Sequence, residues 1–295
     1  MRSAQMTYFI IVAVALLLVM VGLLYIFSTQ EKIQVTTSGS PIPALPAIQN
    51  FVESCLDLVG TKAIYNFAYQ GGYTNPKGDE SLGESGDGRR EHHYSRDTIL
   101  PYAANRDVLS LRPLSEIEQS LSRLVLVKLG SCLDFSAFER QGLKVEKPDI
   151  DFALLGFDNS RMRVPYSSEP VSSRATIGDE DVTLEVNYPI RISSAQGQAI
   201  ITRAVRSIPL RLGLLHQITG AVLADASRYN PYDLVQHCKK FGARDGRVNI
   251  YLDRNPTFLD HALAVVDAAP LDSGFAPLRF QVGMLNINMT GVCTG

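Results

Sequence analysis

Cysteine is the residue of this chain with the most specific chemistry, and two of the four cysteines lie in nearly the same phrase. Cys55 lies in SCLDL and Cys132 lies in SCLDF, while Cys238 and Cys293 stand elsewhere in the chain. An even number of cysteines in an exported domain favours disulfides. Of the three connectivities that four cysteines allow, we expect Cys55 to pair with Cys132 and Cys238 to pair with Cys293.

Two other uses of these cysteines stay open. A reduced, buried cysteine packs as a small apolar side chain, and a thiolate serves as a nucleophile or a metal ligand. The chain has no C-x-x-C pair, so zinc binding and thioredoxin-like chemistry lack their usual spacing. His237 precedes Cys238, but neighbouring side chains on a helix point about 100° apart, so the two would not face each other as base and nucleophile.

The other polar clusters predict neither a catalytic site nor a metal site. His92 and His93 adjoin Glu91, but adjacent side chains in a loop rarely converge on one ion. The sequence has no G-x-S-x-G, P-loop or G-x-G-x-x-G motif. We therefore expect no enzymatic activity, cofactor or metal. Asn288 begins an N-x-S/T triplet, which predicts glycosylation in an exported protein.

The elements that position Cys55 and Cys132 are predicted to be helices. Apolar residues recur at three- and four-residue spacing over Ala47–Tyr69 and over Ser115–Cys132, so each cysteine lies on the apolar face of its helix. Gly71-Gly72 is expected to end the first helix, because glycine adopts the left-handed conformation at low cost. Ser115 and Glu118 have the spacing of a capping box at the start of the second.

Strand patterns dominate the second half of the chain. Alternating apolar residues predict a hairpin over Ala175–Ile192, in which Pro189 marks an edge strand or a bend. A seam of apolar residues predicts a long helix over Gln198–Ser227, kinked or split at Pro209. Shorter expected elements are strands within Lys144–Phe157, Met162–Tyr166, Val248–Leu252 and Pro270–Asn288, and a helix over Tyr232–Phe241.

An uncharged apolar run, Tyr8–Phe27, precedes these elements. Its length matches the roughly 20 residues that cross a bilayer core, so it predicts a single transmembrane helix. Arg2 favours a cytoplasmic N-terminus and an extracellular C-terminal domain. Residues 29–46, rich in Pro, Ser and Thr, predict an extended linker.

Together these patterns predict an α+β protein in four parts. A transmembrane anchor, 1–28, and the linker, 29–46, precede a helical disulfide-linked part, 47–145, and an α+β part, 146–295. The expected fold is a disulfide-stapled helical pair, packed with a small antiparallel sheet and a long kinked helix.

The N-terminal stretch RSAQMTYFIIVAVALLLVM resembles the N-termini of archaeal type IV pilin-like proteins. Arg2, Ala4 and Gln5 match the basic, small and Gln positions of that family, whereas Phe9 stands where bacterial-type pilins have Glu. The resemblance implies cleavage after Ala4, and it leaves a filament subunit and a monomeric anchor as alternatives. The run Phe51–Tyr73 is similar to a group of uncharacterised archaeal membrane-anchored surface proteins, which implies no particular activity.

Charge narrows the expected partners. The formal net charge is −2 and there is no basic block, which argues against nucleic acid. We expect a membrane-anchored structural or interaction protein of the cell surface, which contacts the bilayer through Tyr8–Phe27 and binds copies of itself or other envelope proteins. An anchored exported enzyme, or a ligand-binding module without a recognisable motif, is the alternative.

Overall fold

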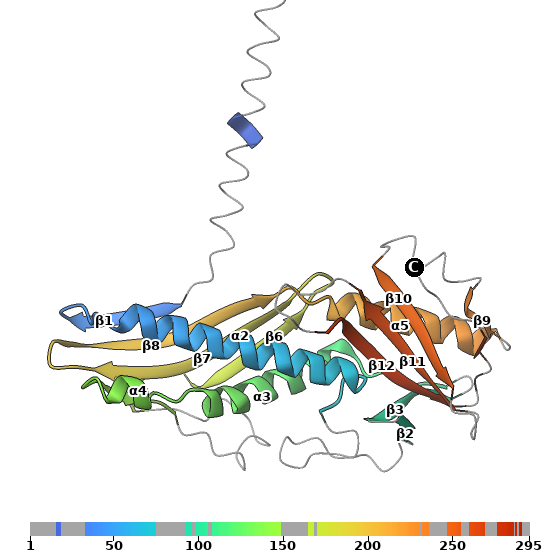
Figure 1. The fold of residues 1–295 in the computed structure, drawn as a ribbon, viewed down its shortest axis with the longest axis horizontal. Coiled ribbons are helices and arrows are strands. Elements are labelled where there is room, and N and C mark those ends of the chain that lie inside the picture. Colours follow the sequence, from blue (N-terminus) through green and yellow to red (C-terminus); the bar gives the residue numbers. More distant parts are fainter. Residues whose placement is uncertain are drawn as a thin grey trace, which may run out of the picture. The chain divides into compact units, whose positions relative to one another are not determined.

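A computed structural model shows the fold of the chain (Figure 1). It describes residues 16–18, 33–74, 92–95, 98–105, 108–148, 165–167, 170–229, 232–235, 247–254, 260–268, 276–285, 287 and 289–290. The chain divides into two compact units, Met1–Lys32 and Ile33–Gly295.

The expected membrane anchor over Tyr8–Phe27 has to be corrected. No helix among the described residues is both long and apolar enough to cross a membrane. Within the expected anchor the structure describes Leu16–Leu18, which are helical and exposed, and the other residues of that run lie outside the described part. The single-pass membrane location was inferred from this run, so it is not supported either.

The unit Ile33–Gly295 is an α+β fold with two main sheets, where one small sheet was expected. The first sheet is antiparallel, in the order β1-β8-β7-β5, and β6 also pairs with β7. Its strands are β1 (Gln34–Gly39), β5 (Lys144–Glu146), β6 (Ser172–Ile177), β7 (Val182–Ser193) and β8 (Gly197–Ile208).

The second sheet has the order β10-β11-β12-β3-β2, with β4 on β3, and its β12–β3 pair is parallel. Its strands are β2 (His92–Ser95), β3 (Thr98–Asn105), β4 (Val108–Leu109), β10 (Val248–Arg254), β11 (Asp260–Asp267) and β12 (Leu278–Leu285). A further short pair joins β9 (Tyr232–Asp233) to β13 (Met289–Thr290). The helices of this unit are α2 (Leu45–Tyr69), α3 (Leu114–Cys132), α4 (Ser136–Glu139) and α5 (Leu212–Arg228).

Helix α2 runs along the first sheet beside α3 and also reaches the second sheet (Figure 1). Gly60 seats α2 on the first sheet, because a Cβ at this position would lie 2.7 Å from Cδ1 of Ile208 in β8. At its C-terminal end, Gly71 lies against Gln281 and Val282 of β12. The apolar face of one helix therefore contributes to the packing of both sheets.

The two predicted helices of the disulfide-linked part are confirmed, with one difference at a terminus. Gly71 and Gly72 have φ of +63° and +93°, and the Gly72 N–H donates to the Phe67 carbonyl at 2.7 Å, so the glycines end α2 as expected. The capping box at the start of α3 is absent: no side chain caps this terminus. Glu118 instead accepts from the backbone N–H of Ile177 at 2.8 Å, which attaches α3 to β6.

The long kinked helix over Gln198–Ser227 is wrong for its first part. Gly197–Ile208 is strand β8, paired with β7 on one side and β1 on the other, and the helix α5 begins only after Pro209. The buried residues Ile201, Ala204 and Ile208 have a spacing that also fits a helix, so periodicity alone did not separate the two structures. Pairing along two neighbouring strands stabilises the extended form.

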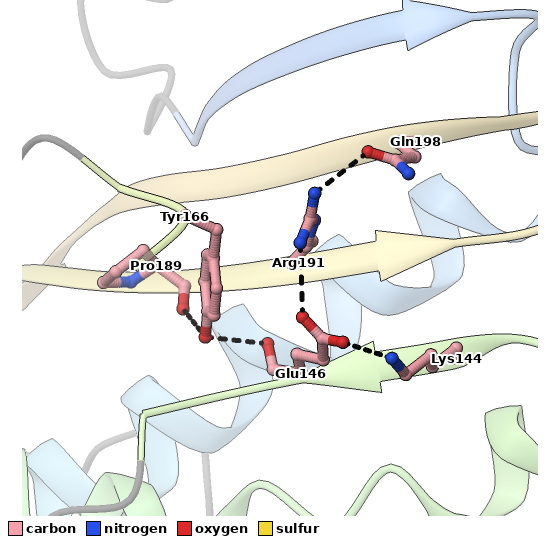
Figure 2. A network of polar contacts seen from close by, with 6 residues as sticks. All are labelled: Lys144, Glu146, Tyr166, Pro189, Arg191 and Gln198. Atoms are coloured by element: carbon pink, nitrogen blue, oxygen red, sulfur yellow. Dashed lines mark hydrogen bonds and ion pairs between the residues drawn. The ribbon is translucent and has the colours of Figure 1, made fainter. Parts of the chain in front are cut away.

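The predicted hairpin of β6 and β7 is confirmed, and Pro189 lies at an irregularity of the β7–β8 register between Asn187 and Ile190. On the other edge of β7, the first residue of β6 lies opposite Asn187 and the last residue of β5 lies opposite Arg191. Tyr166 binds both β5 and β7 near this point (Figure 2). Its hydroxyl lies at hydrogen-bonding distance from two backbone carbonyls, 3.3 Å from that of Pro189 and 3.2 Å from that of Glu146.

Strand β1 lies within the segment that was expected to be an extended linker. Its residues are almost all exposed, and its backbone pairs with β8 from Gln34 to Gly39. Ser and Thr side chains do not require burial, so the composition of this segment did not reveal that its backbone completes a sheet edge.

Candidate functional site

The predicted pairing of Cys55 with Cys132 is confirmed. The two cysteines form a disulfide with a Cα–Cα distance of 5.9 Å, which joins the first half of α2 to the last residue of α3. The alternatives of reduced packing or thiolate chemistry do not apply to this pair. Cys238, Cys293 and Asn288 lie outside the described residues, so the second disulfide and the glycosylation stay predictions.

Two contacts show the relative direction of these helices. It connects an early residue of α2 to the end of α3, while Gly72, just beyond α2, lies against Ile117 in the first turn of α3. Helices α2 and α3 are therefore antiparallel neighbours.

A groove opens between these two helices beside the disulfide. Its volume is about 470 Å³. Helix α2 lines it with Leu58, Val59, Lys62, Ala63 and Asn66, and α3 lines it with Leu124, Lys128, Ser131 and Cys132. Most of these side chains are apolar, and both charged ones are lysines.

Helical spacing explains why these residues share one groove. Leu58, Lys62 and Asn66 follow one another at intervals of four, as do Leu124, Lys128 and Cys132, so each set forms one stripe. Leu58 and Lys62 are each two residues from Gly60, or about 200° around the helix, which directs them away from the sheet that Gly60 contacts. Leu58 accordingly remains 44% exposed, which is unusual for so large an apolar side chain.

The lysines carry the only formal charges among the residues that line the groove. Both are exposed. The residues one turn before and after Lys62 are Leu58, Val59, Tyr65 and Asn66, and those around Lys128 are Leu124, Val125, Ser131 and Cys132, so neither lysine has a carboxylate at ion-pairing distance along its own helix. The groove is thus apolar along its length and positive at its rim.

The acidic residues of the two cysteine phrases, Asp57 and Asp134, make contacts outside the groove. Asp57 binds Arg206 of β8 at 2.9 Å, which holds α2 on the first sheet. Asp134 accepts from the backbone N–H of Ser136 at 3.0 Å, and this hydrogen bond lowers the pKa of the Asp134 carboxyl. Neither carboxylate lines the groove, so the SCLDL and SCLDF phrases do not form a paired acidic site.

Other polar clusters in the described part connect elements. Arg211, at the start of α5, and Asp267 of β11 form a buried ion pair at 2.8 Å. Buried Arg112 donates to the Gly72 carbonyl at 2.6 Å and stacks over Tyr73, 4.5 Å from the ring centre. In the network of Figure 2, Glu146 of β5 binds Lys144 at 2.5 Å and Arg191 of β7 at 3.5 Å.

The described residues contain no group of three or more His, Cys, Asp or Glu side chains that could hold a metal ion. His92 and His93, expected in a loop, lie in strand β2. His237 is outside the described residues.

Sequence reasoning missed Lys62 and Lys128 as site residues. The signal was present: each lysine lies between apolar or neutral residues at the positions where an acidic partner is usual on an exposed helix. Only the antiparallel contact of α2 with α3 brings the two lysine stripes to one groove.

Comparison with protein-family models, with curated proteins and with solved structures finds no match for this chain. The resemblance of its N-terminus to pilin-like proteins, and of Phe51–Tyr73 to archaeal surface proteins, stays a prediction.

Proposed function

We propose that this chain is a binding protein that holds a small ligand with an apolar body in the groove between α2 and α3. The observation that carries the proposal is an apolar groove of about 470 Å³ held beside a disulfide, with Leu58 exposed at its surface. Ligand sites of proteins are concave, mostly apolar and of about 300–1,000 Å³, with a few polar groups that orient the ligand.

The surroundings of the groove favour a site that exists before the ligand arrives. The disulfide joins the two walls at one end, and Gly60 and the Asp57–Arg206 ion pair hold α2 on the first sheet. A site with fixed walls loses less conformational entropy when a ligand binds.

The small size of the groove favours a small molecule over a protein as the ligand. A stable protein–protein interface buries about 800 Å² on each side, whereas this groove is lined by two stripes that together span roughly three helical turns. A single apolar chain or ring system fits these dimensions.

Methyl-resolved NMR of the whole chain tests the proposal. Titration with decanol, an uncharged apolar probe, is expected to shift the methyl signals of Leu58, Val59 and Leu124. Ser131→Trp, which adds bulk within the groove, should weaken these shifts, while Ala137→Trp, an exposed position on α4 outside the lining, should not. Shifts of methyl groups outside the groove in the unaltered chain, or no shifts at all, would exclude the groove as the binding site.

A further inference from the structure

We infer that the ligand of the α2–α3 groove is an amphipathic anion: one apolar chain that ends in a carboxylate or a similar single anionic group. The inference rests on the proposed function, because it names the chemical class that the same groove binds. Its evidence is the charge and placement of Lys62 and Lys128.

The two lysines lie on opposite walls of the groove, at neighbouring positions along the helix axes. Lys62 is seven residues from Cys55 and Lys128 is four residues from Cys132, so at 1.5 Å per residue they lie roughly 10 Å and 6 Å from the disulfide along the helix axes. Their levels therefore differ by about one helical turn. One anionic group at the groove rim lies within reach of both long side chains.

The charge of the groove is not compensated by its own lining. Lysine is the only charged residue type in that lining, and no acidic residue stands one turn from either lysine on its helix. A cationic ligand would be repelled by two like charges, and a neutral ligand would gain only the apolar contacts. An anion with an apolar body uses both properties of the groove.

The apolar part of the ligand has a defined place. Leu58, Val59 and Ala63 of α2 and Leu124 of α3 supply the apolar part of the groove lining. Lysine side chains cover apolar surface with their methylene stems while the charged end stays in water. The ligand chain would therefore lie between the helices, with its anionic end at the solvent side.

A comparison of three probes with the same alkyl chain tests the inference on the intact, disulfide-bonded protein. Decanoate is expected to bind roughly tenfold tighter than decanol at low ionic strength, because two exposed ion pairs contribute modestly, and decylamine should bind weakest. The preference for decanoate should shrink as salt is added, since exposed charges are screened.

Substitution of the lysines separates charge from packing. The double variant Lys62→Gln and Lys128→Gln should lose this preference and bind decanoate and decanol with equal affinity. Lys144→Gln, an exposed lysine on β5 outside the groove, is the matched control and should keep the preference.

Each outcome bears on one of the two proposals. Equal binding of decanoate and decanol by the unaltered chain would overturn the anionic ligand while the groove itself remains the binding site. A preference for decanoate that survives the double substitution would overturn the role of Lys62 and Lys128. Failure of both probes to shift the groove methyl signals would overturn the proposed function as well.

Discussion

The ion pair of Arg211 and Asp267 is buried, so its loss is expected to have a large effect on stability. Both side chains are less than a tenth exposed, so removal of one partner leaves a charge without compensation in the interior. Arg211→Met is expected to lower the free energy of unfolding by about 3–5 kcal/mol, measured by urea denaturation.

Arg206 offers a matched control for this prediction. It also binds an aspartate, Asp57, but both members of that pair are a third or more exposed. Arg206→Met should therefore lower the free energy of unfolding by no more than about 1 kcal/mol. Equal losses in the two variants would contradict the role assigned to burial.

His216 is expected to couple stability to pH. Its ring Nε2–H donates to the Arg112 carbonyl, with a nitrogen–oxygen distance of 2.8 Å, and burial lowers the pKa of the imidazole below its ordinary value of 6.5. The unfolded chain then takes up a proton before the folded chain does, so stability is complete above about pH 6.5 and falls as the pH drops below that value.

Denaturation midpoints between pH 7.5 and 5 test this coupling. His216→Gln keeps a side-chain N–H donor but does not titrate, so its midpoint should depend less on pH in this range than that of the unaltered chain. Parallel pH profiles for the two proteins would show that His216 is not the group responsible.

At the scale of elements, the disulfide is the strongest single link between α2 and α3. It closes a loop with a sequence separation of 77 residues, and the chain-entropy account assigns such a cross-link about 4 kcal/mol of stability. The double variant Cys55→Ala and Cys132→Ala is therefore expected to have a free energy of unfolding that is lower by about 4 kcal/mol. Its urea denaturation midpoint should fall accordingly.

The same double variant reports on the groove. Since Cys132 lines it, loss of the link should also broaden the methyl signals of Leu58 and Leu124 through motion of the two walls. An unchanged midpoint would contradict the stabilising role of the disulfide, and unchanged methyl signals would show that packing on the first sheet alone holds the groove.

At the scale of the whole unit Ile33–Gly295, α2 should make the two sheets unfold together. The helix contacts β8 of the first sheet and β12 of the second. Gly60→Val would bring side-chain atoms against Leu184 and Ile208, and overpacking of this kind costs about 1–3 kcal/mol. The loss is expected to appear in both sheets, although the side chains nearest to Gly60 belong to the first.

Hydrogen exchange under native conditions measures this coupling. The slowest amides of β7 in the first sheet and of β11 in the second should lose protection by the same amount in Gly60→Val. Gly142→Ala is a useful control, because nothing lies within 4 Å of a Cβ built there, although its φ of +87° makes some local strain expected. Loss of protection confined to β7 would show that the sheets unfold independently.

What the sequence by itself determined is local. The apolar stripes of α2 and α3, the Gly71-Gly72 stop and the alternation of β6 and β7 could be predicted, because each depends on residues only a few positions apart. The Cys55–Cys132 pair, 77 residues apart, was expected but not determined by the sequence: both cysteines lie on apolar helix faces, and the packing of those faces brings them together.

Only the tertiary structure decided the rest. Gly197–Ile208 is a strand because β1 and β7 pair with both of its edges, and its apolar spacing fits a helix as well. The candidate site has the same origin: Lys62 and Lys128 are ordinary exposed lysines until antiparallel packing sets their helices side by side. Partners distant in the chain satisfy backbone hydrogen bonds and bury apolar surface in ways that local spacing does not encode, so both features had to be read from the packed molecule.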